Sequence, residues 1–285
     1  MQQRAISSIG VVAVGLIPAL LGGWIFALVF TAICLVAYSE LIRIVDPSVP
    51  EFVSIGVVVV AVSGLLATLS QRSSIGSVAA GLALAVPLIW CVLRTVPNPI
   101  DAASRMFLAT SYLALPLVAA IQLRADHQYP AADWLRSLAG AMPKVGDATG
   151  GGLAWFLLAL LVTWLFDTFA YLVGKTWGRR KLIPRISPNK TVEGSIGGLV
   201  AAGLTALLCN QVFGMGLGVV TALFCGLLLG AVGQLGDLVE SMLKRARGVK
   251  DSGNLIPGHG GMLDRIDALV FVVTATWLLA PVVAK

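Results

Sequence analysis

The sequence predicts an all-α membrane protein, a polytopic bundle of about nine transmembrane helices with a polar, cytoplasm-facing cavity in its C-terminal half. Of the 285 residues, 58% are hydrophobic and only 12% are charged, about half the charged share of an ordinary soluble domain. Apolar runs of about 20 residues, the length that crosses a bilayer core, recur along the chain. Charged residues gather instead in a few connections, so we expect most of the chain to lie in a lipid bilayer.

The candidate spans follow one another in close succession. They are residues 5–22, 24–44, 53–70, 75–95, 106–123, 153–174, 195–213, 215–236 and 267–284. A transmembrane β-barrel is the alternative, and it would show segments of about ten residues with alternating apolar and polar side chains. Stretches 153–166 and 217–232 are continuously apolar, which favours helices. The first run, which follows Arg4, also resembles a signal peptide, although no clear small-residue cleavage site follows it.

The basic residues predict the orientation of the spans. Two connections hold eleven of the 20 basic residues: Lys175, Arg179, Arg180, Lys181, Arg185 and Lys190 in one, and Lys244, Arg245, Arg247, Lys250 and Arg265 in the other. Two spans separate these connections, so both emerge on one side, which the positive-inside rule makes cytoplasmic. Nine spans would then place both termini outside. Because topology accounts for the net charge of +6, we expect no nucleic-acid partner.

The composition of the connections divides the chain into two regions, 1–151 and 152–285. In the first region the connections are short and their scattered charges form no constellation. We therefore assign it as a scaffold of transmembrane helices, with lipid access and oligomer contacts as further roles. Residues 124–151 form a longer polar connection in which Trp134 would anchor at the membrane interface. The second region carries the polar motifs and is the predicted catalytic region.

The first polar motif lies near the cytoplasmic end of the span at 153–174. Trp164, Asp167, Thr168 and Tyr171 are spaced by three and four residues, so they share one helix face. An acid at this depth is costly unless it is paired or functional. Asp167 therefore either pairs with a basic residue in the bundle or belongs to a site.

The next motif follows in the connection after that helix. Its polar residues are Ser187, Asn189, Lys190, Thr191 and Glu193. Thr191 or Asn189 would be the N-cap of the following helix, and Glu193 would complement its dipole. A helix N-terminus beside Ser187, Lys190 and the preceding Lys175 is also an anion site, because backbone N–H groups and ammonium groups converge there. We favour phosphate binding.

The third motif begins on a predicted helix that leaves the membrane. Asp237, Glu240, Ser241 and Lys244 recur at intervals of three and four residues and form a polar stripe. The segment 248–261 then contains five glycines and a proline, a composition that ends a helix and can wrap backbone amides around an anion.

Two further acids, Asp264 and Asp267, follow the glycine-rich segment and are three residues apart, so we expect them to converge with Asp237. Three carboxylates with almost no histidine suit Mg²⁺ rather than zinc. Abundant lysine and arginine suit phosphate groups, so the pattern predicts phosphoryl or nucleotidyl transfer. The sequence contains neither a Walker A motif nor a G-x-S-x-G motif.

The motifs together resemble a known family. The 27 residues 241–267, SMLKRARGVKDSGNLIPGHGGMLDRID, resemble the signature of the phosphatidate cytidylyltransferases, also called CDP-diacylglycerol synthases. Supporting motifs occur in the family's order: Trp164-x-x-Asp167-Thr168-x-Ala170-Tyr171, Ser187-Pro-x-Lys190-Thr191-x-Glu193-Gly194 and Gly236-Asp237-x-x-Glu240-Ser241. The resemblance covers roughly 160–270 and rests on hydropathy alone before that.

The resemblance implies a reaction in which CTP and phosphatidic acid give CDP-diacylglycerol and pyrophosphate, with Mg²⁺ required and a second cation such as K⁺ allowed. It implies a multi-pass protein of the bacterial inner membrane, with CTP, phosphatidic acid and membrane lipid as partners, and it allows a homodimer. The implied metal ligands are Asp237 and Asp264, with Asp267 close by.

The implied site contains further residues. The expected catalytic residues are Asp237, Lys244, Arg245, Asp264, Arg265 and Asp267. The expected substrate-binding residues are Asp167, Lys175, Ser187, Lys190, Thr191, Glu193, Ser241, Lys250, Asp251 and His259, with His259 either orienting the glycine segment or contacting a ligand. The chain departs from the family's pattern at Leu165 and Phe166, where small or polar residues are expected beside Asp167.

Two alternatives stay open at this point. A related CTP-dependent membrane enzyme, either an archaeal-type ether-lipid cytidylyltransferase or a polyprenol kinase, would share shorter pieces of the site. A transporter would also place acids within spans, but its polar residues should line a path through several helices. Here the polar residues crowd two connections at one face, which favours the enzyme.

Overall fold

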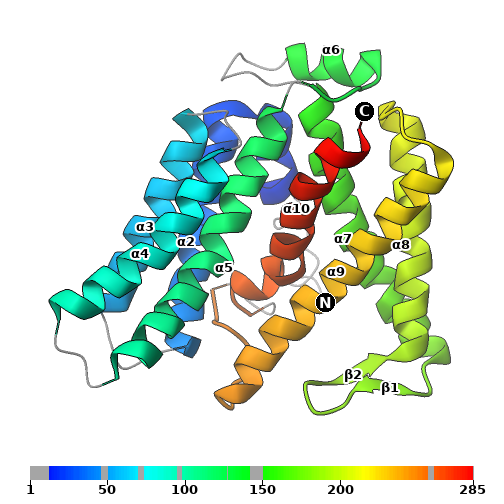
Figure 1. Cartoon of the computed structure of the whole chain (residues 1–285). Helices are drawn as coiled ribbons and strands as arrows, with labels where there is room; N and C mark the ends of the chain where they lie inside the picture. Colours follow the sequence, from blue (N-terminus) through cyan, green and yellow to red (C-terminus); the bar gives the residue numbers. More distant parts are fainter. Residues whose placement is uncertain are drawn as a thin grey trace.

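The computed structural model describes residues 13–45, 51–69, 74–94, 98–126, 128–141, 150–255 and 260–284 as a helical bundle with one small β-hairpin (Figure 1). Residues 13–21 are helical and precede α2. The other helices are α2 (Gly23–Val45), α3 (Glu51–Leu69), α4 (Ser74–Leu93), α5 (Pro99–Ala125), α6 (Asp133–Ala141), α7 (Gly150–Trp177), α8 (Val192–Phe213), α9 (Val219–Ala246) and α10 (Leu263–Val283). The strands are β1 (Lys181–Ile183) and β2 (Ser187–Thr191). The prediction of an all-α bundle is confirmed, with the hairpin as a small addition.

The chain is a multi-pass membrane protein. Within the described residues, six helices are long and apolar enough to cross a membrane, namely α2, α5, α7, α8, α9 and α10. The apolar parts of α3 and α4, Val53–Leu69 and Ser77–Leu93, are shorter. Each predicted span overlaps a helix, but part of the first one lies outside the described residues, so the count of nine stays a prediction.

One side of α8 carries exposed apolar side chains along most of its length. Exposed Ile196, Val200, Leu204, Leu208 and Val212 repeat every four residues, so they form a continuous apolar ridge along the outside of the helix. Such a ridge would be unfavourable in water and is expected against lipid. The inner side of α8 carries small residues that allow neighbouring helices to approach closely.

These close approaches hold α7, α8 and α9 together. A Cβ added at Gly198 of α8 would lie 2.9 Å from the ring of Phe166 on α7, and one at Gly226 of α9 would collide with the backbone of Ala202 on α8. Membrane helices gain no hydrophobic free energy from leaving lipid, so tight packing at small residues is a main source of their association.

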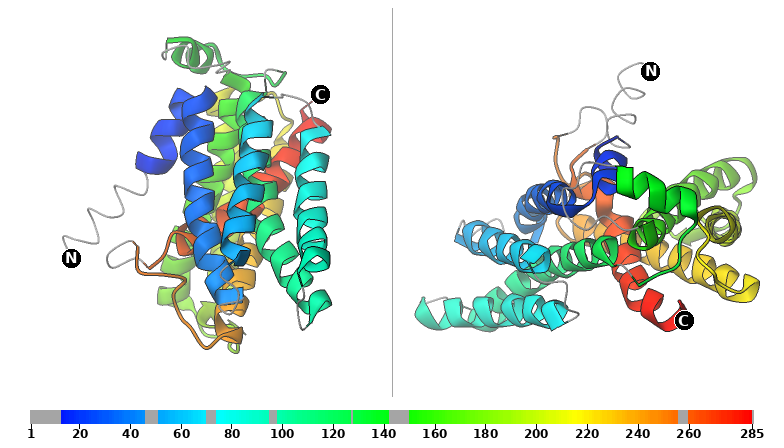
Figure 2. Two further views of the ribbon diagram at one scale, coloured as in Figure 1. Left: turned by 90° about the vertical axis from the view of Figure 1, so that its left-hand side faces the viewer. Right: turned by 90° about the horizontal axis from the view of Figure 1, so that it is seen from above.

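The helices form two groups that α10 joins. The first group is α2 to α5, the second is α7 to α9, and α10 contacts members of both (Figure 2). The rings of Phe26 and Phe30 on α2 also pack edge-on against Phe156 of α7, with centroid distances of 4.9 and 5.5 Å. The predicted boundary between residues 151 and 152 falls within the first turn of α7.

The two ends of the bundle differ in character. One end, here called the α6 end, carries α6 within the predicted polar connection. Its Trp134 donates a hydrogen bond from Nε1 to the carbonyl of Val212 at 2.9 Å, so this side chain secures the end of α8. Gly214 ends α8 in a left-handed conformation at φ 62°, which a side chain there would disfavour.

The opposite end, here called the hairpin end, carries β1 and β2 (Figure 1). The strands pair antiparallel, with Lys181 opposite Thr191 and Ile183 opposite Ser187. Both basic connections lie at this end, as the prediction that they share one side requires. Arg247, just after α9, donates a hydrogen bond to the carbonyl of Val45 at the end of α2, so the N-terminal group of helices also reaches this end.

Candidate active site

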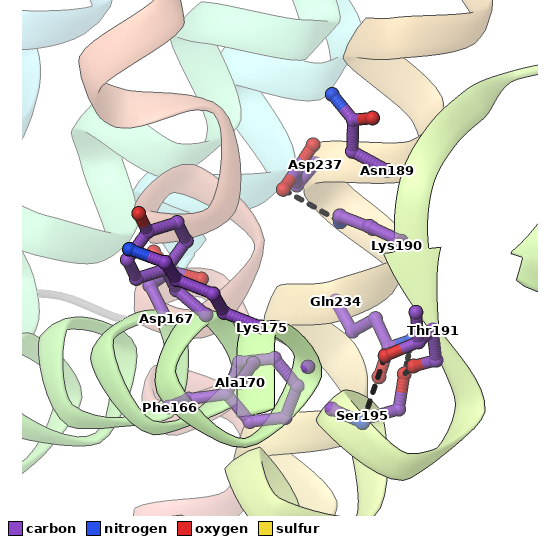
Figure 3. Close-up of a pocket in the computed structure, with 13 residues that line it drawn as sticks. Phe166, Asp167, Ala170, Lys175, Asn189, Lys190, Thr191, Ser195, Gln234 and Asp237 are labelled. Atoms are coloured by element: carbon purple, nitrogen blue, oxygen red, sulfur yellow. Dashed lines mark hydrogen bonds and ion pairs between the residues drawn. The ribbon is translucent and has the colours of Figure 1, made fainter. Parts of the chain in front are cut away.

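A cavity of about 430 Å³ opens between α7, β2, α8 and α9 at the hairpin end (Figure 3). It is lined by Phe166, Asp167, Ala170, Tyr171, Gly174, Lys175, Asn189, Lys190, Thr191, Gly194, Ser195, Gln234 and Asp237. One part of the wall is apolar and the other is charged. Its volume lies in the range of small-molecule sites. The cavity therefore brings together the first two polar motifs and the beginning of the third.

An ion pair between Lys190 and Asp237 closes one side of this cavity. Lys190 Nζ on β2 lies 2.6 Å from Asp237 Oδ2 on α9, and Figure 3 shows both side chains pointing toward each other. About a quarter of each side chain is exposed, 25% for Lys190 and 28% for Asp237. The hydroxyl of Ser241 donates to Asp237 Oδ1 at 3.3 Å. One oxygen of Asp237 is thus paired with the ammonium group of Lys190, and the side chain remains accessible from the cavity.

Asp167 faces the same charges from α7. Its carboxylate interacts electrostatically with Asp237, Lys190 and Arg265. Asp167 therefore borders the cavity, within reach of both an acid, Asp237, and a base, Lys190. Phe166, where the family's pattern is small or polar, is buried against Gly198 and forms part of the apolar wall.

The start of α8 is fixed by two side chains of the second motif. Thr191 is the N-cap, with extended backbone and its Oγ1 accepting a hydrogen bond from the Gly194 N–H at 3.1 Å. Glu193 Oε2 accepts from the backbone N–H groups of Arg179 and Arg180 at 3.0 and 3.1 Å. Glu193 therefore ties the start of the hairpin to α8 and does not line the cavity.

A second cluster of charge lies deeper, between α9 and α10. Lys244 Nζ is 2.5 Å from Glu240 Oε2 and 2.6 Å from Asp264 Oδ1. The other oxygen of Asp264 accepts hydrogen bonds from the Ser252 N–H, the Ser252 hydroxyl and the Gly261 N–H at 2.8 to 3.0 Å. The side chains of Lys244, Glu240 and Asp264 are only 10%, 1% and 7% exposed. The predicted polar stripe on α9 therefore turns inward and fixes the glycine-rich segment.

Glu40 of α2 joins this cluster, although no pattern in the sequence placed it there. Its Oε2 accepts from the Ser252 hydroxyl at 2.9 Å and from the Leu263 N–H at 2.8 Å, and its Oε1 accepts from the Met262 N–H at 3.1 Å. The prediction about the first region concerned the charges of its connections, whereas Glu40 lies within a predicted span and contributes from there to the inner cluster. The available signal was a single acid inside an apolar span, because ionisable residues within spans are rare and are usually paired or functional.

Asp267 lies between the two clusters on α10. Its charge interacts with those of Asp237 and Glu240, and its Oδ1 accepts from the Ala268 N–H at 2.8 Å. Two buried oxygens close to these acids, Glu240 Oε1 and Tyr112 Oη, have no hydrogen-bond partner in the described part of the chain.

The remaining predicted site residues lie at the periphery. Lys175 lines the rim of the cavity and lies over the Tyr171 ring at 5.7 Å. Arg245 donates to the carbonyl of Val249 at 2.8 Å and is exposed. Lys250, Asp251 and Arg265 are also exposed, and Ser187 begins β2. His259 lies outside the described residues.

Comparison with known sequences agrees with this arrangement. Residues 2–283 match the sequence profile of the cytidylyltransferase family. The chain belongs to the cytidylyltransferase family. It is 50% identical over 128 residues to the phosphatidate cytidylyltransferase of Bacillus subtilis (strain 168), an alignment that covers 45% of this chain and 48% of the relative. With the phosphatidate cytidylyltransferase of Staphylococcus aureus (strain COL), identity is 52% over 122 residues, or 43% and 47% of the two chains. The aligned part thus spans about half the length of these relatives.

The donors of this cytidylyltransferase-family site fit a hard cation such as Mg²⁺. Among the described residues, no three histidine, cysteine, aspartate or glutamate side chains form a ready-made metal cage. Mg²⁺ commonly needs only one or two carboxylates, because water and substrate phosphates complete its coordination. The charge of Asp267 interacts with those of Asp237 and Glu240, and Glu240 Oε1 has no hydrogen-bond partner among the described residues. Asp264 is more fully occupied, since Lys244 holds one of its oxygens and three donors hold the other.

Proposed function

We propose that this protein transfers the cytidylyl group of CTP to phosphatidic acid and so forms CDP-diacylglycerol and pyrophosphate. The observation that carries the proposal is the cavity at the hairpin end, whose wall is apolar at Phe166, Ala170 and Tyr171 and charged at Lys190 and Asp237. Such a wall suits an amphiphilic substrate with a phosphate group. Membership in the cytidylyltransferase family and the names of the bacterial relatives support this choice.

The reaction needs no protein nucleophile. A phosphate oxygen of the lipid attacks the α-phosphorus of CTP, a new P–O bond forms, and the bond between the α-phosphorus and the bridging oxygen breaks as pyrophosphate leaves. In-line displacement of this kind is catalysed by positioning and by offsetting charge. Lys190 and Lys175 border the cavity and would bind phosphate oxygens, and the exposed Arg265 adds positive charge from the start of α10.

Mg²⁺ is part of the same proposal. Asp237, Asp264 and Asp267 are the carboxylates that would hold it, with Asp237 the most accessible because it borders the cavity. The cation would neutralise phosphate charge during displacement. Lys190 occupies one oxygen of Asp237 and would release it as the cation and phosphate enter, whereas Lys244 would keep Asp264 oriented. A second cation such as K⁺ would offset the negative charge around Asp267.

The hairpin end would face the cytoplasm of a bacterial cell, in its inner membrane. Both basic connections lie at this end, in agreement with the positive-inside rule. CTP would enter from this side, and the lipid would arrive from the membrane past the apolar wall of the cavity. A homodimer is compatible with this arrangement.

Incubation of the purified protein with CTP labelled at the α-phosphorus, phosphatidic acid and Mg²⁺ tests the proposal. We expect label in the lipid phase and an equal amount of pyrophosphate, and neither when Mg²⁺ is chelated. Release of CDP together with a phosphorylated polyprenol, in a parallel reaction with polyprenol, would instead identify a kinase. No lipid product from either substrate would refute lipid-directed catalysis.

A further inference from the structure

The glycine-rich segment before α10 is held by a side chain from a distant part of the chain. Glu40 lies on α2, 212 residues before Ser252, and is only 6% exposed. Its carboxylate accepts three hydrogen bonds, from the Ser252 hydroxyl and from the Met262 and Leu263 N–H groups. A buried carboxylate is costly unless its oxygens are satisfied, and these three donors satisfy them.

Glu40 caps the N-terminus of α10, which has no capping hydrogen bond from its own N-cap side chain. Met262 occupies the N-cap position of α10, and its side chain makes no capping hydrogen bond. Glu40 supplies this cap from another helix, because it accepts from the first N–H groups of α10. Its negative charge also lies at the positive end of the α10 dipole, which stabilises both.

Two glycines make this approach feasible. A Cβ at Gly253 would lie 2.6 Å from Glu40 Oε1, and a Cβ at Gly261 would collide with Glu40 Oε2 and with the Ser252 hydroxyl. The backbone at Gly253 and at Gly261 therefore approaches the Glu40 carboxylate closely. The glycine-rich composition predicted an anion-binding loop, and at these two positions the nearby anion is the Glu40 carboxylate of the protein itself.

The network continues from Glu40 into the proposed site. The Ser252 hydroxyl lies 2.9 Å from Glu40 and 3.0 Å from Asp264 Oδ2. Having one hydrogen, it donates to one carboxylate at a time, so the two acids share it. Asp264 then contacts Lys244, which contacts Glu240. The orientation of Asp264 in the first turn of α10, and of Asp267 at the start of the second turn, thus depends on Glu40.

We infer that Glu40 is a positioning residue of the site, holding the glycine-rich segment and the first turn of α10 so that Asp264 and Asp267 are aimed correctly. The inference rests on the proposed function, since it assigns Glu40 a part in cytidylyl transfer. Glu40 touches no substrate in this account and acts through Ser252 and the start of α10. The first region of the chain therefore contributes to the site as well as to the scaffold.

Glu40→Gln tests the inference, because it keeps the length of the side chain and removes its charge and one acceptor. We expect kcat to fall by roughly 10- to 100-fold, the usual effect of removing a group that orients catalytic carboxylates. The folded fraction in detergent should stay near that of the wild type, and Glu40→Asp, which keeps the charge, should retain more activity than Glu40→Gln. Asp133→Asn, an exposed acid on α6, is the matched control and should behave as wild type.

Amide hydrogen exchange in the absence of substrate gives a second readout. Glu40→Gln should speed exchange at Met262 and Leu263 by about fivefold for each hydrogen bond lost, while the rest of α10 is unchanged. Should Glu40→Gln accumulate poorly, Ser252→Ala removes only the bridging hydroxyl, and we expect it to lower kcat about tenfold while Leu263 stays protected.

Unchanged exchange and unchanged kcat in Glu40→Gln would overturn the inference. Activity lost only in proportion to the unfolded fraction would do the same, because Glu40 would then be a purely structural cap. A normal kcat in Ser252→Ala would break the link to Asp264. A wild-type protein that makes no CDP-diacylglycerol would instead refute the proposed function, whereas the exchange experiment would still report on the Glu40 contacts.

Discussion

Two lysine–carboxylate clusters lie at the hairpin end, and they differ mainly in how far solvent reaches them. In the outer cluster, Lys190 and Asp237 border the cavity and are about one quarter exposed. In the inner cluster, Lys244 is enclosed by Glu240 and Asp264, all at most 10% exposed. An open ion pair exchanges readily with a phosphate or a cation, whereas a buried one is held by its surroundings. The outer pair would therefore exchange readily with substrate, whereas the inner cluster holds Asp264 in place.

Asp237→Asn should have the largest effect on activity, because it removes charge from the open cluster. We expect the rate of CDP-diacylglycerol formation to fall by about 100- to 1000-fold, the effect of losing one major electrostatic contact in a site. The protein should still insert and remain folded, since only one partly exposed ion pair is lost. Steady-state assays over a range of Mg²⁺ concentrations measure this, and a near-normal rate would remove Asp237 from the proposed metal site.

Lys244→Met should have the largest effect on stability. It leaves the carboxylates of Glu240 and Asp264 buried without their shared ammonium, which costs about 3–5 kcal/mol in the free energy of unfolding. Unfolding in a denaturing detergent measures the loss of stability in Lys244→Met and in Lys190→Met. We expect the larger loss in Lys244→Met. Equal loss of stability in both variants would contradict the division into an open and a structural cluster.

Thr191→Ala should have the smallest effect of the three. It removes the N-cap of α8 beside the outer cluster and should cost about 1 kcal/mol of stability. Thr191→Ser keeps the capping hydroxyl and serves as the control. If Thr191→Ala lowered the rate as strongly as Asp237→Asn with no loss of stability, Thr191 would belong to the substrate site instead.

Much of this arrangement could be predicted from the sequence, because lipid imposes a simple rule on long apolar segments. Each predicted span overlaps a helix, and the spacing of Asp237, Glu240, Ser241 and Lys244 gave the polar stripe on α9. Local patterns also predicted Thr191 as one of two candidate N-caps. In these cases the residues that determine the structure lie within a few positions of one another.

The parts that escaped prediction depend on contacts between distant segments or on weak local preferences. Glu40 reaches Leu263 across 223 positions, and no periodicity connects them. The hairpin of β1 and β2 contains proline, asparagine and lysine, which have low strand preference, so its pairing could not be read from composition. The sequence also could not show that Lys190 selects Asp237 while Lys244 selects Glu240 and Asp264.

Labelling of lysines tests the central contrast most directly. The folded protein, in detergent, would be treated with an amine-reactive reagent, and the extent of modification at each lysine would be measured by mass spectrometry with and without CTP and Mg²⁺. We expect Lys190 to be modified and to be protected by CTP with Mg²⁺, while Lys244 stays unmodified in both conditions. Modification of Lys244 at the rate of Lys190, or no protection of Lys190 by CTP, would contradict this expectation.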